Sequence, residues 1–237
     1  DTTPRGNWLR ALPHLPDFML SPYFFKGLAL LREVKAKVKV RRVGRIEAIG
    51  NDRLSEVAFD GDRLPADLLL LHQGVVPNVN LAVAAGIKHG WNDRRLSFEP
   101  VLDADFASSV SGIAVAGDGA GIAGGPAAVE RGRIAAIAAV RALRPEAAVP
   151  DPQATRQRLR REETGRAFLD ELNRPADLFR LPEGDTVACR CEEVTAEQVR
   201  ETARMGCEGP NQMKAFLRCG MGPCQGRLCG LTITELI

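Results

Sequence analysis

All six cysteines of the chain lie between Cys189 and Cys229, and none precedes that segment. Secreted domains that depend on disulfides distribute their cysteines so that the bonds close several loops, whereas thiolates gathered in one short segment suit a metal ion or an iron–sulfur cluster. Free thiols also persist best in a reducing compartment. We therefore expect a metal-binding C-terminal segment in a cytoplasmic protein, with a peripheral place at the inner membrane also open to it.

Two cysteine pairs have a spacing that suits cluster ligands. One residue separates Cys189 from Cys191, and four residues separate Cys224 from Cys229. Four thiolates suit a [2Fe–2S] cluster or zinc, but zinc sites more often place roughly two to four residues between paired cysteines. Cys219 and Cys224 are also four residues apart, so spacing alone leaves the second pair open. Free thiols without a metal are the remaining alternative.

The sequence between the cysteine pairs predicts short helices. Thr195 and Gln198 form a capping box that opens one helix, and Gly206 closes it. Pro210 predicts the start of a second helix, and Pro223 that of a third. Helices that fold back here would bring the cysteine pairs together, and free amides at the third helix would donate to sulfur. Nearby glycines that would add amide donors are Gly220, Gly222 and Gly226.

The first part of the chain predicts a mixed α/β structure. Alternating apolar residues at 34–40 and a hairpin around the turn at 50–52 indicate strands. Continuous apolar runs at 67–71 and 112–116 are typical of strands that are buried on both faces. An alanine-rich helix follows at about 126–143.

A glycine turn, Gly117-Asp118-Gly119, joins the second apolar run to the alanine-rich helix. Strand, glycine turn and helix form a phosphate-binding layout, because flexible glycines and helix N-terminal amides admit a phosphate or a flavin. Glycines at 119, 121 and 124 match a dinucleotide fingerprint, but no acidic residue lies at 138–142 to hold a ribose. Asp118 is placed to accept hydrogen bonds from sugar-chain hydroxyls. The alternative is a turn without a ligand, in which Asp118 caps a helix.

This part of the chain resembles the two-dinucleotide-domain flavoproteins. Residues 67–78 look like the strand that returns from that family's NAD-type domain, and residues 111–121 look like its second FAD motif. The resemblance implies that Asp118 hydrogen-bonds the ribityl chain of FAD and that Gly117 and Gly119 border the flavin. The family's first FAD fingerprint is absent, which leaves the FAD site incomplete in this chain. Because the sequence also begins without Met, we expect either proteolytic trimming or the later part of a longer polypeptide.

The C-terminal segment resembles bacterioferritin-associated ferredoxins, in the form found at the C-terminus of FAD-containing α subunits. These subunits belong to opine oxidase, hydrogen cyanide synthase and dye-linked amino acid dehydrogenases acting on proline or hydroxyproline. Residues 220–229 carry the phrase distinctive of that group, and residues 70–78 and 116–122 also look like it. The resemblance leaves Cys207 and Cys219 as spares. The [2Fe–2S] ligands it implies are Cys189, Cys191, Cys224 and Cys229.

Charge and hydropathy argue against nucleic-acid binding and against a membrane-spanning helix. The 32 Lys and Arg residues are mixed with 30 Asp and Glu residues, so no basic stripe predicts nucleic-acid binding. No apolar run reaches the roughly 18 residues of a spanning helix, and the first residues lack a signal-peptide pattern. We expect neither a nucleic-acid partner nor a transmembrane segment.

These features predict an α/β fold: the C-terminal part of an FAD/NAD(P)-type oxidoreductase domain at 1–148, a helical connector at 149–183, and an all-α [2Fe–2S] domain at 184–237. The expected activity is that of an FAD-dependent oxidoreductase subunit of the CH–NH class. It would relay electrons between flavin and cluster in a hetero-oligomer with a substrate-oxidising flavoprotein subunit, and pass them to an acceptor. The alternatives are a metal-stabilised docking subunit without redox activity and an NAD(P)H-dependent reductase.

Overall fold

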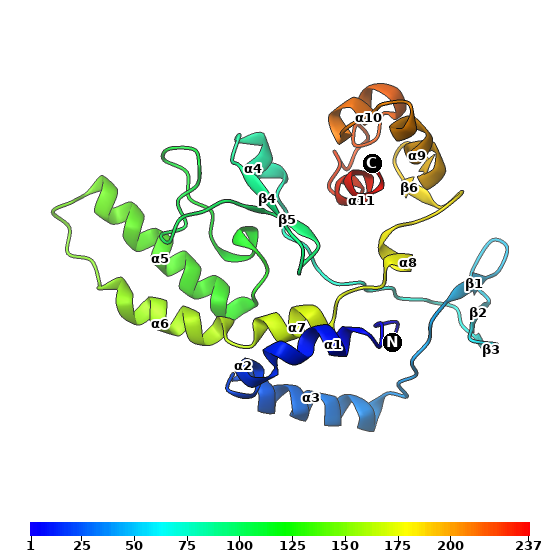
Figure 1. The fold of residues 1–237 in the computed structure, drawn as a ribbon, viewed down its shortest axis with the longest axis horizontal. Coiled ribbons are helices and arrows are strands. Elements are labelled where there is room, and N and C mark those ends of the chain that lie inside the picture. The colour runs from blue at the N-terminus through cyan, green and yellow to red at the C-terminus, as the bar shows by residue number, and fades with distance from the viewer. The chain divides into compact units, whose positions relative to one another are not determined.

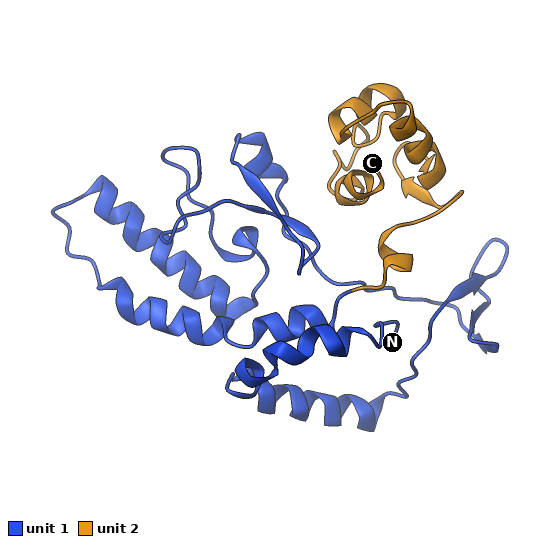
Figure 2. Ribbon diagram, viewed as in Figure 1, with its two compact units in different colours: residues 1–174 blue, residues 175–237 orange.

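The computed structural model describes residues 1–237 and divides into two compact units, residues 1–174 and residues 175–237 (Figure 2). Figure 1 labels their helices and strands. The helices of unit 1 are α1 Asn7–Ala11, η1 Leu12–His14, α2 Leu15–Met19, α3 Tyr23–Lys37, α4 Asn80–Ala84, η2 Gly117–Ala120, α5 Gly125–Leu143, α6 Pro152–Glu163 and α7 Arg166–Leu172. Its strands are β1 Glu47–Ile49, β2 Glu56–Phe59, β3 Asp62–Pro65, β4 His89–Asn92 and β5 Ser97–Pro100. Unit 2 contains α8 Asp177–Arg180, β6 Val187–Cys189, β7 Val194–Thr195, α9 Ala196–Arg204, α10 Pro210–Leu217 and α11 Gly230–Leu236.

Helices α5 and α6 pack along the small side chains of α5. Ala127 and Ile134 of α5 are buried in one cluster with Leu159 of α6. Helix α6 is capped by Asp151, whose carboxylate accepts a hydrogen bond from the Gln153 amide at 3.1 Å. The predicted alanine-rich helix is confirmed, and its small residues let the partner helix approach closely.

A second core of unit 1 is aromatic and joins the N-terminal helices to α7. The rings of Phe168 and Phe18 stack with centroids 4.4 Å apart, and Trp8 meets Phe168 edge-on at 5.8 Å. The buried side-chain amide of Asn7 donates to two carbonyl groups at the end of α7, at 2.8 and 3.1 Å. These bonds satisfy carbonyls that a helix end leaves without partners.

The sheets of unit 1 are small and antiparallel. Strands β1, β2 and β3 form a meander in that order, which confirms the hairpin predicted around 50–52. Strands β4 and β5 form a separate hairpin, in which Trp91 lies opposite Phe98 with the ring centroids 5.1 Å apart. The second hairpin contributes one wall of a cavity described below.

The two runs predicted to be buried strands are wrong. Residues 67–71 form no strand, and Leu70 is 82% exposed. In residues 112–116 only Ala114 makes an isolated bridge, to Ala107. A strand buried on both faces needs paired neighbours and covering helices. The sheets of unit 1 supply no neighbour to either run.

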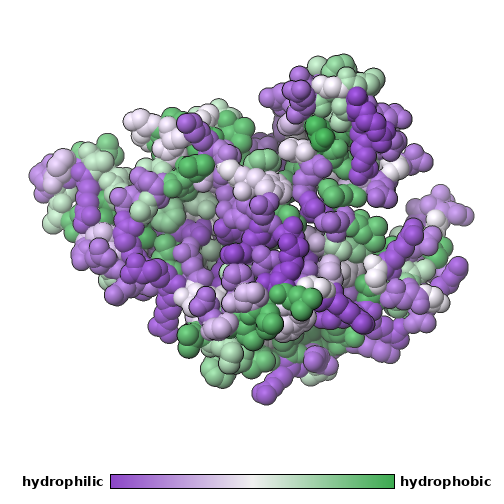
Figure 3. Space-filling view, viewed as in Figure 1, coloured by the Kyte–Doolittle hydropathy of each residue, from purple (hydrophilic) through white to green (hydrophobic).

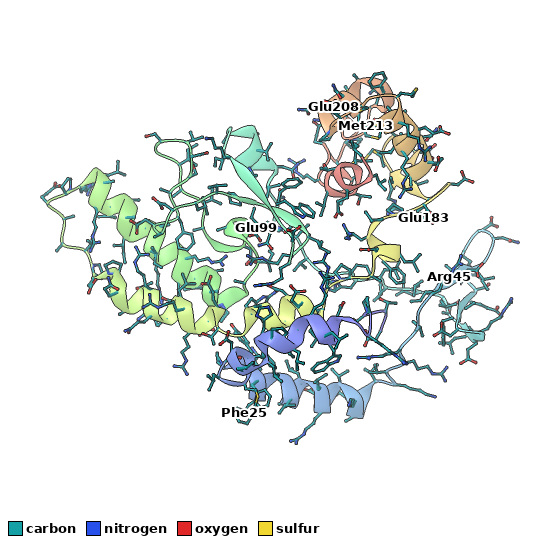
Figure 4. All side chains as sticks on the ribbon, in the orientation of Figure 1. Phe25, Arg45, Glu99, Glu183, Glu208 and Met213 are labelled. Atoms are coloured by element: carbon teal, nitrogen blue, oxygen red, sulfur yellow. The ribbon has the colours of Figure 1, made fainter.

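Helix α3, Tyr23–Lys37, runs into the segment that was predicted to be a strand. The backbone becomes extended only at Val38, so the strand predicted at 34–40 is wrong. An ion pair from Lys37 to Glu33, 2.7 Å long, supports the last turn. Phe25, labelled in Figure 4, is exposed on this helix, and Figure 3 shows other hydrophobic side chains at the surface among hydrophilic ones. None of the helices is both long and apolar enough to cross a membrane.

Unit 2 is built around a core of its own. Val199 of α9, Met213 of α10 and Ile233 of α11 are almost completely buried in one cluster. The capping box is present, with Thr195 accepting from the Gln198 amide and the Gln198 side chain accepting from the Thr195 amide. The first two predicted helices of this segment are confirmed.

Two expectations for the C-terminal segment need correction. The unit is not all-α, because β6 and β7 pair antiparallel. The third helix predicted from Pro223 is absent, and residues 223–229 form consecutive turns before α11 begins. Gln225 and Gly226 have φ values of 52° and 77°, a left-handed conformation that a right-handed helix excludes. The stretch 149–183 is helical and is divided between the units, with α6 and α7 in unit 1 and α8 in unit 2.

Candidate metal centre and glycine turn

The four predicted ligands lie at the ends of short elements in unit 2. Cys189 ends β6 and is fully buried, and Cys191 is exposed in the turn before β7. Cys224 is half-buried in the turns of 223–229, and Cys229 is buried where α11 begins. Because α11 packs against β6, cysteines far apart in the sequence meet in space.

The four thiols form two contacting pairs. The Cys229 thiol donates to the sulfur of Cys189, and the Cys191 thiol donates to the sulfur of Cys224. The pairs are neighbours, because Cys229 also interacts electrostatically with Cys224. The fold thus gathers both ends of the cysteine pattern at one place.

Backbone amides favour the thiolate of Cys189. Burial acts to raise the pKa of this thiol, but hydrogen bonds outweigh it, and the pKa of Cys189 is lowered from its ordinary value. The thiolate is the form that binds metals. The donors to this sulfur are the amides of Gly220 and Glu192, the thiol of Cys229 and the amide of Cys191.

Cys224 is surrounded in a similar way by the turns that follow it. The amide of Leu228 is the largest cause of the lowered pKa of Cys224, and slight burial opposes it. Further donors are the Cys191 thiol and the amides of Gly226 and Cys229. Several backbone amides that donate to one sulfur are usual around the thiolates of a cluster.

A fifth sulfur lies beside the two pairs. Burial raises the pKa of Cys219 to about 12, and the adjacent Cys189 adds to the effect. Burial and then Cys189 likewise raise the pKa of Cys229 to about 12. Because it lies beside Cys189 and its spacing allows it, Cys219 stays a second candidate for the ligand set. Cys207 instead lies in the core of unit 2, with its sulfur 3.5 Å from the carbonyl oxygen of Gly209.

Glycines allow the turn segment to approach the first pair. A Cβ atom at Gly222 would lie 2.3 Å from the Cβ of Cys191 and 3.3 Å from its sulfur, so no larger residue fits there without displacement. Gly220 and Gly226 are also close, since a Cβ on Gly220 would lie 3.6 Å from the Cα of Gly226. The phrase at 220–229 is thus shaped by contact with the cysteines.

The cysteines are not arranged as the ligands of a single metal ion. No group of three or more His, Cys, Asp or Glu side chains is arranged to hold one metal ion. A [2Fe–2S] cluster takes four thiolates shared between two irons, so its ligands need not converge on one point. The two thiol pairs supply four sulfurs of this kind.

The glycine turn is held by one arginine of α5. Gly117, Asp118 and Gly119 lie in η2, where Gly117 has a φ of 69°. Arg131 donates to the carbonyl oxygens of Gly117, at 3.4 Å, and Gly121. The carboxylate of Asp118 caps neither η2 nor α5, so the capping alternative is not realised.

A cavity of about 880 Å³ in unit 1 was not predicted from the sequence. Six arginines and five acidic residues line it, together with Trp91. Burial raises the pKa of Asp170, while nearby Arg166 and Arg95 act against the shift. Two of its ion pairs, Arg95 with Glu99 and Arg166 with Asp170, have four-residue spacings that a sequence can reveal. The arginines are Arg10, Arg94, Arg95, Arg131, Arg166 and Arg174, and the acids are Asp93, Glu99, Glu163, Asp170 and Glu171.

Comparison with known proteins places this sequence beside oxidoreductase subunits. It is 45% identical to an opine oxidase subunit of Agrobacterium tumefaciens over 98% of the chain, and 46% identical to the Rhizobium meliloti protein of the same name over the whole chain. It is 33% identical over 87% of its length to hydrogen cyanide synthase subunit HcnB of Pseudomonas aeruginosa. The chain spans about half the length of these relatives, since the matches cover 48%, 47% and 48% of their residues. No family model matches the chain.

One solved structure has a similar fold. The crystal structure of L-proline dehydrogenase from P. horikoshii matches 87% of this chain and 42% of its own, with a TM-score of 0.64 at 20% sequence identity. The similarity expected from the motifs at 70–78, 116–122 and 220–229, to opine oxidase and hydrogen cyanide synthase subunits, is confirmed. The proline dehydrogenase likeness concerns the fold alone.

Proposed function

We propose that this chain is part of an FAD-dependent oxidoreductase subunit of the CH–NH class that relays electrons between a flavin and a [2Fe–2S] cluster. The names of its relatives, opine oxidase and hydrogen cyanide synthase subunits, support the oxidoreductase assignment. The substrate class that they suggest is an amino acid, an imino acid or an opine. The proposed cluster ligands are Cys189, Cys191, Cys224 and Cys229.

The observation that carries the proposal is the pairing of the four thiols, two of which, Cys189 and Cys224, accept hydrogen bonds from backbone amides. A bound cluster would supply one-electron chemistry, which a flavin can exchange with it. The amides that lower the pKa of Cys189 and Cys224 would offset the negative charge of four thiolates. The close approach at Gly222 would keep water away from one side of Cys191.

The proposed flavin contacts are Gly117, Asp118 and Gly119. The carboxylate of Asp118 has no capping role and is available to accept hydrogen bonds from ribityl hydroxyls. Arg131 fixes the turn from behind by holding its carbonyl oxygens. These residues make up part of a flavin site, and the rest of the FAD contacts would come from outside this chain.

The proposed partners are an electron acceptor and a substrate-oxidising flavoprotein subunit. The relatives are named as subunits, which supports a hetero-oligomer. A cytoplasmic location is part of the proposal, since all six cysteines are free thiols.

The test is iron and acid-labile sulfide analysis with a visible spectrum, on anaerobically purified protein. We expect about two irons and two sulfides per chain, and reduction by dithionite to a species with an electron paramagnetic signal. Cys224→Ser should abolish the visible absorption, whereas Cys207→Ser, at a sulfur outside the two pairs, should retain it.

Zinc without sulfide, or a metal that dithionite does not reduce, would contradict the relay and favour a docking subunit. Retention of the spectrum in Cys224→Ser together with its loss in Cys219→Ser would assign Cys219 as the ligand. Bleaching of a flavin by NADH would favour the reductase alternative.

A further inference from the structure

The two cysteine pairs of unit 2 differ in their access to solvent. Cys189 and Cys229, the inner pair, are 0% and 4% exposed. Cys191 is exposed and Cys224 is half-buried, so these two cysteines, the outer pair, lie at the surface of unit 2. An electron passes between proteins most readily where a redox group comes nearest to the surface, because electronic coupling decays steeply with distance. The outer pair is therefore the side of the site that a redox partner can reach.

Apolar side chains border the outer pair. Met221 directly precedes Gly222, whose Cβ position lies 3.3 Å from the sulfur of Cys191. The amide of Leu228 donates to the sulfur of Cys224. The side chains of Met221 and Leu228 are 46% and 74% exposed. Large apolar residues that remain exposed around a functional group are typical of the centre of a protein interface.

The charges around this border are mainly positive. Arg190 is exposed beside the outer pair, and Arg227 donates to the carbonyl oxygen of Cys224 at 3.4 Å. Glu192 is already paired, since the Nε atom of Arg218 lies 3.0 Å from its Oε2 atom. A surface on which cations outnumber carboxylates attracts an acidic partner in a salt-dependent way. The nearby cations are Arg190, Lys214, Arg218 and Arg227, and the nearby carboxylates are Glu192 and Glu193.

We propose that the outer pair and its border form a docking surface, at which unit 2 exchanges electrons with a redox protein whose contact surface is apolar at the centre and acidic at the rim. The inference rests on the proposed cluster. It adds the place where electrons cross the surface of unit 2 and the kind of protein that meets it there. In each encounter one electron passes to the partner's redox centre, which is reduced as the cluster is oxidised, and no bond or proton changes place.

The test is stopped-flow oxidation of the dithionite-reduced chain, freed of excess dithionite, by two strong one-electron oxidants of opposite surface charge. Copper(II) plastocyanin presents an acidic contact surface, and ferric cytochrome c presents a basic one. We expect the rate with plastocyanin to fall at least about tenfold as salt is raised from about 10 mM to about 500 mM. The rate with cytochrome c should stay constant or rise, because salt screens a repulsion there.

Substitutions at the border test which residues make the surface. Arg190→Gln and, separately, Arg227→Gln should each lower the low-salt rate with plastocyanin by about threefold or more. Leu228→Ser should lower the rate while leaving its dependence on salt unchanged, since it removes apolar contact and no charge. Arg160→Gln, at an exposed arginine of α6 in unit 1, removes the same charge and should react as the unmodified chain does.

Binding measured without electron transfer gives a second readout. Copper(I) plastocyanin cannot accept an electron, and biolayer interferometry should rank its affinity for the variants in the same order as the rates. Iron and sulfide analysis of every sample comes first, and two arginine variants guard against loss of the cluster in one. Absence of a cluster from the unmodified chain would remove the proposed function and this inference together. With the cluster present, a plastocyanin rate that does not depend on salt, or unchanged rates in the loaded arginine variants, would overturn this inference alone.

Discussion

Unit 2 has one continuous hydrophobic core, whereas the buried residues of unit 1 fall into separate small clusters. In unit 2, residues from β6, α9, α10 and α11 share a single cluster that includes Met213 and Val199. In unit 1, the cluster around Ile134 and the aromatic group around Phe168 are distinct, and the run that includes Leu70 is exposed. Local helix signals are enough to predict the structure where a short chain segment forms its own core. Apolar strands need partners that this part of the chain does not supply.

The largest effect expected from this contrast is in amide hydrogen exchange. Residues 67–79 donate no backbone hydrogen bond to another backbone group, while the amides of α9 lie in a helix packed on the core. Protection in α9 should exceed that in 67–79 by at least about a thousandfold, because core amides open only with global unfolding at about 5 kcal/mol or more. Exchange followed by mass spectrometry measures both regions in one sample. Equal protection would end the contrast between the units.

Phe168→Ala should destabilise the aromatic group of unit 1 most among single substitutions. The side chain is 2% exposed and stacks 4.4 Å from Phe18, so its removal leaves a cavity and costs about 3–5 kcal/mol. Phe25→Ala, at a ring that is 76% exposed, should change the free energy of unfolding by less than about 0.5 kcal/mol. Urea unfolding of the two variants supplies the comparison. Similar losses would show that the ring at 25 is covered in solution.

The sequence predicted well those features whose signals are local. The capping box at Thr195 and Gln198, the alanine-rich helix and the hairpin at 50–52 each depend on residues a few positions apart. The gathering of the cysteines followed from their clustering in one segment. These signals act before distant segments meet, which explains their reliability.

The failures arose where distant residues decide the outcome. The runs at 67–71 and 112–116 have the composition of buried strands, but strand pairing depends on neighbours elsewhere in the chain. The turn that replaces the third helix depends on the left-handed Gln225 and Gly226, which composition does not specify. The cavity joins Arg10, Arg94 and Glu171, which are too far apart for any spacing rule.

Gly222→Ala tests the comparison between the units, because it disturbs the cysteine pairs of unit 2 without replacing any of the proposed ligand cysteines. The added methyl group would overlap Cys191 and should cost about 1–3 kcal/mol in unit 2 while lowering iron content. Gly230→Ala is the matched control, because nothing lies within 4 Å of the Cβ position there and helix α11 begins at that residue. Iron analysis and thermal unfolding report the two effects. Full iron occupancy in Gly222→Ala would show that the turn does not shape the site.

Thr195→Ala should have the smallest effect and tests whether local signals sustain unit 2. The threonine hydroxyl accepts from the Gln198 amide at 3.3 Å, and its removal leaves a helix N–H without a partner. The expected loss is about 0.5–2 kcal/mol in the free energy of unfolding, measured by denaturant titration. Thr195→Ser, which keeps the hydroxyl, should restore most of it. If neither variant changes stability, the core around Met213 holds α9 in place without its N-cap. Packing would then outweigh the capping signal even in unit 2, whose helices the sequence predicted best.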